Sequence, residues 1–315
     1  MSAEGHDNRT LLIAFAANLG IAVSKFVAAA FTGSSAMLTE GIHSVVDSLN
    51  QLLLLWGRRQ SRKAPDAQHP FGYGRELYFW SFVVAVLVFA LGAGVSVYEG
   101  VLHIMAPEEA MSPIVAYAVL AVAFLLEGGS TFAAFREFRE AKGSLGWFQA
   151  VRVSKDPPAF IVLLENGAAM AGILVAAAGV ALSQASGNPL FDGAASVAIG
   201  LILGVTALVL AIESKALLIG EAADPELVAS IRAAAEAEAG IVGVGHILTM
   251  HSAPDQITVV MNADFEDAIT AGEVERIIAR IEAKVETCWP SVKRLYIRPQ
   301  QDAVQIGAAI EAGRG

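Results

Sequence analysis

Cysteine is nearly absent from this sequence, with only Cys288 in 315 residues. A single thiol excludes an intramolecular disulfide framework and a thiolate-rich metal site. Basic residues are also scarce: 21 Lys and Arg against 31 Asp and Glu give a net charge of −10, which argues against a nucleic-acid partner. We find no cleavable signal peptide in the polar first ten residues and no His-Glu-x-x-His motif, so an intramembrane metallohydrolase is disfavoured. We expect neither an enzyme nor a bound cofactor.

What the sequence has in excess is apolar residues. They make up 55% of the chain, and the mean hydropathy of +0.56 is typical of a membrane protein. Six apolar windows are each long enough to cross about 30 Å of hydrocarbon as a helix, and an even number of spans places both termini on one side. The windows cover residues 11–31, 36–57, 77–104, 112–135, 158–183 and 190–212.

The basic residues divide the connections between these windows into two kinds. The connections near 32–35, 103–111 and 183–189 contain no Lys or Arg. Because basic residues concentrate on the cytoplasmic side, we expect both termini in the cytoplasm, in the inner membrane of a bacterial cell. The basic clusters are Arg58, Arg59, Arg62, Lys63 and Arg75, then Arg136, Arg139, Lys142, Arg152 and Lys155, and finally Lys215.

From about residue 221 the pattern changes to that of a small soluble domain. The order α-β-β-α-β predicts a two-layer α+β domain of ferredoxin-like type. Asp224 and Pro225 begin the first helix and Gly240 ends it, strands follow at 241–251 and 256–265, Thr270 and Glu273 form a capping box for a helix to about Thr287, and the last strand is 292–297. The predicted organisation is a tail at 1–10, a six-helix membrane domain at 11–220, the soluble domain at 221–300 and a flexible tail at 301–315.

Polar residues gather on one face of the second window. On a helix, Glu40, His43 and Asp47 are spaced so that their directions fall within about 60° of one another. The segment 38–51 contains no Lys or Arg to neutralise them. One interpretation is a structural hydrogen-bonded pair between helices. The other is an ion site, because imidazole nitrogen and carboxylate oxygen at i, i+4 suit Zn²⁺, Co²⁺, Fe²⁺ or Mn²⁺.

Further ligands are available in two other places. Glu165 and Asn166 are the only strongly polar residues in the apolar run of the fifth window, although Asn also bonds structurally across membrane helices. In the loop after the second window, Asp66 and His69 at i, i+3 form a possible second metal site, but loops often carry such pairs.

Several motifs together resemble the cation diffusion facilitator family of metal/proton antiporters. They are HSVVD in the second window, HPFGYGRE after it and ESKALLIGE closing the sixth window. The VLLEN sequence resembles a branch of that family that includes the mitochondrial zinc transporter of animals, which reads VLLED. The resemblance covers about residues 9–300 and implies a homodimer in the lipid bilayer, with a tetrahedral site built from spans two and five.

The resemblance implies a set of ligands that this sequence meets only in part. His43 and Asp47 supply the span-two pair, whereas the span-five pair falls on Val162 and Asn166, so Glu165 is the expected replacement carboxylate. Glu40 is expected behind the ligands or along the ion path. The family's clustered ligands are missing from the soluble domain, so we expect His246 and His251 to be ordinary strand-surface histidines.

These observations predict a secondary active transporter that exports divalent transition metal ions, Zn²⁺ first, in exchange for protons. Fe²⁺, Mn²⁺, Co²⁺ and Cd²⁺ are alternative cargoes. A metal-gated cation channel and, less favoured, a membrane metal sensor are the alternatives.

Overall fold

The computed structural model describes residues 19–107 and 113–301. The described chain forms two compact units. The first is built from residues up to 65 and from 76–215, and the second from 66–75 and from 216 onward. The second unit therefore includes the loop at 66–75. The predicted tails at 1–10 and 301–315 lie outside the described residues, apart from Gln301.

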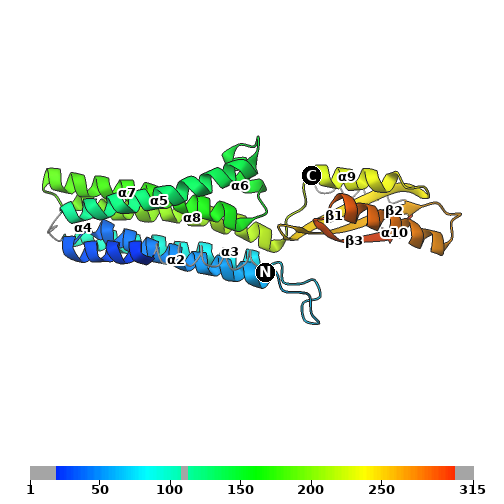
Figure 1. Ribbon diagram of the computed structural model, residues 1–315, viewed down its shortest axis with the longest axis horizontal. Helices are drawn as coiled ribbons and strands as arrows, with labels where there is room; N and C mark the ends of the chain where they lie inside the picture. Colours follow the sequence, from blue (N-terminus) through cyan, green and yellow to red (C-terminus); the bar gives the residue numbers. More distant parts are fainter. Residues whose placement is uncertain (1–18, 108–112, 302–315) are drawn as a thin grey trace, which may run out of the picture. The chain divides into compact units, whose positions relative to one another are not determined.

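Helices are the only regular structure in the described part of the first unit (Figure 1). Its helix α2 packs against α3, the π-helical segment η1, α4 and α7, while α5 packs against α7. Buried, mostly Ala, Ile and Leu residues of the Leu19–Thr32 helix, α2, η1, α5, α7 and α8 form its core. The helices are Leu19–Thr32, α2 (Ser35–Ser61), α3 (Glu76–Leu87), η1 (Val88–Gly94), α4 (Val95–Met105), α5 (Pro113–Lys142), α6 (Trp147–Val153), α7 (Pro157–Ser186) and α8 (Leu190–Ile219).

Four helices of the described chain are long and apolar enough to cross a membrane. They are Glu76–Met105, Ile114–Glu140, Pro157–Ser186 and Leu190–Ile219, and they coincide with the third to sixth predicted windows. Helix α2 has 27 residues, which is a spanning length, but its polar side chains keep it out of this group. The first window is described only from Leu19. The count of six spans therefore stays a prediction.

The second unit contains a three-stranded sheet and two helices (Figure 1). Strand β2 is central, antiparallel to β1 and parallel to β3. Alternate β2 residues from Ile257 to Phe265 share one buried core with residues of α9 and α10, which gives two layers. The elements are α9 (Pro225–Glu236), β1 (Ile241–Ala253), β2 (Gln256–Phe265), α10 (Ala271–Cys288) and β3 (Val292–Pro299).

The helix starts that the sequence predicts in the second unit are confirmed. The Asp224 side chain accepts from the Glu226 amide at the start of α9, and Thr270 with Glu273 forms the predicted capping box of α10. Helix α9 nevertheless ends at Glu236, before Gly240. Gly240 instead has φ of 93°, a conformation that glycine adopts without strain, immediately before β1. The predicted end of α9 was therefore wrong by about one turn.

Candidate metal centre

The polar face of α2 places an imidazole beside a carboxylate. His43 Nδ1 lies 3.4 Å from Asp47 Oδ1, as expected for residues one helical turn apart. The His43 side chain is 1% exposed and that of Asp47 is 18% exposed, so both lie within the helical unit. A nitrogen and an oxygen in this arrangement are ligands that Zn²⁺ and related divalent cations accept.

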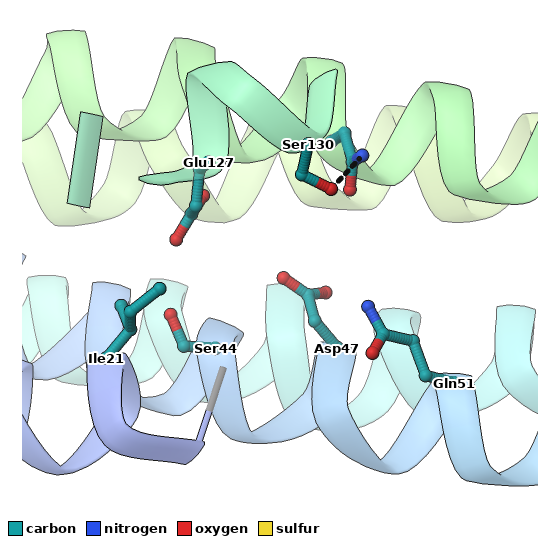
Figure 2. A pocket seen from close by; sticks show the side chains of 7 residues that line it. Ile21, Ser44, Asp47, Gln51, Glu127 and Ser130 are labelled. Atoms are coloured by element: carbon teal, nitrogen blue, oxygen red, sulfur yellow. Dashed lines mark hydrogen bonds between the residues drawn. The ribbon is translucent and has the colours of Figure 1, made fainter. Parts of the chain in front are cut away.

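Asp47 also borders a pocket that lies between α2, α5 and α7. In Figure 2, Ser44, Asp47 and Gln51 face Glu127 and Ser130. Across the pocket, Asn166 Nδ2 donates to Ser130 Oγ at 3.2 Å, so the oxygen of the Asn166 amide is its remaining polar atom. The pocket is lined by Ile21, Ser44, Asp47, Gln51, Glu127, Ser130 and Asn166. The structure thus brings Asp47 and Asn166 to one cavity.

Glu165 takes a different direction from its neighbour. Successive residues on a helix point about 100° apart. Glu165 is 4% exposed, and its Oε1 accepts a hydrogen bond from Asn50 Nδ2 at 2.7 Å. Since Asn50 lies on α2 three residues after Asp47, the Glu165 carboxylate reaches the same stretch of α2 without lining the pocket.

Glu40 is paired with Lys25, which lies outside residues 38–51. Lys25 Nζ lies 3.0 Å from Glu40 Oε2 and 2.9 Å from Glu127 Oε1, and it donates to Ser44 Oγ at 2.8 Å. Lys25 and Glu40 are both fully buried. Residues 38–51 contain no Lys or Arg, as the sequence shows, and the neutralising cation comes from the preceding helix. A lone basic residue inside an apolar window was the signal that we missed.

The side chains of Asp66 and His69 make most of their contacts within their own loop. Asp66 Oδ1 accepts from the backbone amides of Gln68 and His69, and Asp66 Oδ2 accepts from the Tyr73 hydroxyl at 2.7 Å. The hydrogen bond from Tyr73 is the main reason that the pKa of Asp66 is lowered. His69 Nδ1 lies 3.6 Å from Asp66 Oδ1, and its ring centroid is 4.3 Å from that of Tyr73. Both oxygens of the Asp66 carboxylate therefore accept hydrogen bonds from within the loop.

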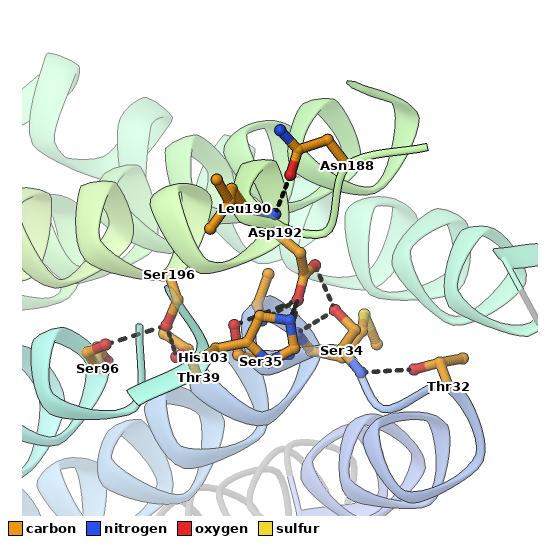
Figure 3. A network of polar contacts seen from close by, with 12 residues as sticks. Thr32, Ser34, Ser35, Thr39, Ser96, His103, Asn188, Leu190, Asp192 and Ser196 are labelled. Atoms are coloured by element: carbon orange, nitrogen blue, oxygen red, sulfur yellow. Dashed lines mark hydrogen bonds and ion pairs between the residues drawn. The ribbon is translucent and has the colours of Figure 1, made fainter. Parts of the chain in front are cut away.

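A second buried polar network joins α2, α4 and α8. The Asp192 carboxylate accepts from Ser34 Oγ at 2.6 Å, from the Ser35 amide at 2.7 Å and Ser35 Oγ at 3.2 Å, and from the Ala36 amide at 3.3 Å. His103 Nε2 lies 3.8 Å from the same carboxylate (Figure 3). Asp192 therefore satisfies amides at the start of α2, which otherwise have no partner within the helix.

No group of three or more His, Cys, Asp or Glu side chains that could hold a metal ion occurs within residues 19–107 and 113–301. The predicted ligands occur instead as the pair His43 and Asp47, with Asn166 across the pocket. In the soluble domain, His251 is only 5% exposed, so the expectation of a surface position for it was wrong. Its Nδ1 lies 3.3 Å from the Ala253 carbonyl oxygen.

Comparison with known proteins identifies the family. Residues 11–219 match the model of the cation efflux transmembrane domain. The chain belongs to the cation efflux, or cation diffusion facilitator, family. This is a family of multi-pass membrane transport proteins and not of enzymes, as the sequence predicted.

Several relatives of this cation efflux protein carry functional names. The mitochondrial proton-coupled zinc antiporter SLC30A9 is 35% identical over 236 residues in Homo sapiens and 32% identical over 248 residues in Xenopus laevis. These alignments cover 71% and 78% of this chain and 41% and 44% of the relatives. Metal tolerance protein C4 of Arabidopsis thaliana is 33% identical over 223 residues, 70% of this chain and 49% of that protein. The chain thus spans less than half the length of these relatives.

Proposed function

We propose that the chain is a secondary active transporter that exports divalent transition metal ions, Zn²⁺ first, from the cytoplasm in exchange for protons. The observation that carries this proposal is the pocket that Asp47 and Asn166 share, with His43 against Asp47. Relatives named proton-coupled zinc antiporters support both the cargo and the exchange.

His43, Asp47 and Asn166 are the proposed ligands at the pocket, with Glu165 as a further carboxylate. They offer one nitrogen and several oxygens but no thiolate, a set that suits Zn²⁺, Fe²⁺, Mn²⁺, Co²⁺ or Cd²⁺ better than Cu⁺. Glu165 joins this set only if it leaves Asn50, to which it is hydrogen-bonded. We therefore expect Asn166 to contribute to metal binding in the conformation described here, and Glu165 to contribute at a later step of transport.

Exchange for protons follows from the same groups. Imidazole and carboxylates bind a metal ion in their deprotonated forms and can take up protons when the ion leaves. Metal release and proton uptake are then linked at His43 and Asp47. A separate proton pathway is not required for coupling.

The transport test uses purified full-length protein in lipid vesicles under a pH gradient. Zn²⁺, Mn²⁺, Fe²⁺, Co²⁺ and Cd²⁺ are compared for uptake and for the accompanying proton movement. Asp47→Ala should abolish transport, and His43→Ala should abolish it or change the preferred ion. Removing one of four ligands loses several kcal/mol of affinity, since structural Zn²⁺ sites total about 10–16 kcal/mol. Glu140→Gln is the matched control, because Glu140 is an exposed carboxylate paired with Arg136.

The doublet on α7 is tested separately. Asn166→Ala should weaken metal binding, and Glu165→Gln should slow transport more than it weakens binding. Normal transport by Asp47→Ala would refute the site, as would unchanged metal affinity and rate in both doublet variants. The polar face of α2 would then be structural.

We further propose six membrane spans, a ferredoxin-like soluble domain, a homodimer, and cytoplasmic termini in a bacterial inner membrane. The distribution of basic residues supports the orientation. With Cys288 replaced by Ser, an impermeant thiol reagent added outside should label Ser186→Cys and miss Ser230→Cys. The opposite pattern of labelling would overturn the topology.

A further inference from the structure

Lys25 is the centre of a cluster of four side chains, here called the Lys25 cluster: Lys25, Glu40, Ser44 and Glu127. Its ammonium group contacts one oxygen of each of the other three, at 2.8–3.0 Å. An ammonium has three hydrogens to donate, so all of them are used. The cluster ties the Leu19–Thr32 helix to both α2 and α5.

The cluster borders the proposed ion pocket. Ser44 and Glu127 line the pocket together with Asp47, whereas Glu40 does not (Figure 2). Each of the two glutamates also has a second oxygen, Glu40 Oε1 and Glu127 Oε2, that is buried and lacks a hydrogen-bond partner within the described residues. Glu127 thus presents a carboxylate to the pocket, and Lys25 holds one of its oxygens.

A purely structural role explains this arrangement poorly. Buried ion pairs can often be replaced by apolar residues of similar volume with little loss of stability, or with a gain. The charges at the pocket offer a better reason. With the groups ionised, Glu40, Glu127, Asp47 and Lys25 have a formal charge of minus two, so Lys25 offsets one negative charge beside the pocket.

We propose that Lys25 is a specificity-determining residue: a tethered cation that occupies Glu127 and keeps this carboxylate out of the ligand set. This inference rests on the proposed function of the pocket. With Lys25 in place, an entering ion meets His43, Asp47 and Asn166. Without Lys25, it also meets the Glu127 carboxylate, and additional carboxylate oxygens favour Mn²⁺ relative to Zn²⁺.

Two double variants test this idea at constant charge. K25M/E40Q leaves Glu127, which lines the pocket, and K25M/E127Q leaves Glu40, which does not. Both variants keep the formal charge of minus two, so neither leaves an additional net charge buried. Binding of Mn²⁺ and of Zn²⁺ to the purified full-length proteins is measured by calorimetry, with K25R as the variant that retains the cation.

K25M/E40Q should raise the affinity for Mn²⁺ relative to Zn²⁺ by about tenfold or more, because an unpaired carboxylate then lies at the pocket. K25M/E127Q and K25R should keep the wild-type ratio within about threefold. Equal ratios of Mn²⁺ to Zn²⁺ affinity in the two double variants would overturn the inference. The inference would also be overturned if K25M/E40Q failed to fold while the other variants folded, because the cluster would then be structural. Failure of the wild-type protein to bind either ion would instead refute the proposed function.

Discussion

Replacement of Asp192 tests whether one carboxylate holds the start of α2. Asp192 is 5% exposed and accepts hydrogen bonds from Ser34, Ser35 and Ala36. Hydrogen bonds to a charged group contribute about 1.5–3 kcal/mol each, and loss of a helix cap costs about 0.5–2 kcal/mol. Since these bonds share one acceptor group, they do not add fully. We expect Asp192→Ala to lower the free energy of unfolding by about 3–5 kcal/mol.

Two further variants make this prediction specific. Asp192→Asn keeps one oxygen acceptor but loses the charge, so it should cost about half as much as Asp192→Ala. Asn188→Ala, in the same connection, removes an exposed side-chain acceptor of the Leu190 amide and should cost at most about 1 kcal/mol. Stability is measured by thermal and denaturant unfolding of the purified protein in detergent. An effect of Asp192→Ala no larger than that of Asn188→Ala would refute the reasoning.

Three other predictions follow from local geometry. Gly172→Ala should destabilise the protein by about 1–3 kcal/mol, because the new Cβ would overlap Glu40 Oε1 and Lys25 holds the Glu40 carboxylate in place. Gly167→Ala on the same helix meets nothing within 4 Å and should not destabilise the protein, so equal unfolding temperatures of the two variants would contradict this prediction. The capping hydrogen bonds lower the pKa of Glu273, so its stabilising effect should be present above the ordinary pKa of glutamate and be lost as the pH falls through the lowered value. The gap in stability between wild type and Glu273→Gln should therefore close in acid, and a constant gap would argue against the cap. Asp66→Ala should lower the rate of transport more than it lowers metal affinity, because the Asp66 carboxylate accepts hydrogen bonds from within the loop. A loss of metal affinity as large as that of Asp47→Ala would contradict this prediction.

The parts of the fold that were predicted from sequence depend on local chemistry. The capping box at Thr270 joins residues three positions apart, and the alternation along β2 reflects the period of a strand. The proximity of His43 and Asp47 was predictable for the same reason, because one helical turn separates them.

The contacts that could not be predicted from the sequence join residues that are far apart in the chain. Lys25 pairs with Glu127 across 102 positions, and Asp192 reaches Ser34 across 158. Neither separation has a period that a sequence pattern could reveal. The different directions of Glu165 and Asn166 also depend on how α7 is rotated against its neighbours, which tertiary packing sets.

The polarity of α2 has a consequence for biosynthesis. In the proposed six-span topology α2 crosses the membrane, where a charged residue at the centre of a helix costs about 2.5–3.5 kcal/mol on insertion. Asp47 lies near the centre of α2 and Glu40 near its start. Its neighbour in the chain has the same difficulty with Lys25, yet Lys25 and Glu40 are only 15 positions apart and neutralise each other once both helices are present. Entry of these two helices as a hairpin avoids the state in which either charge stands alone in lipid. In the proposed topology, the polar residues assigned to the ion path would also make α2 dependent on its neighbours for entering the membrane.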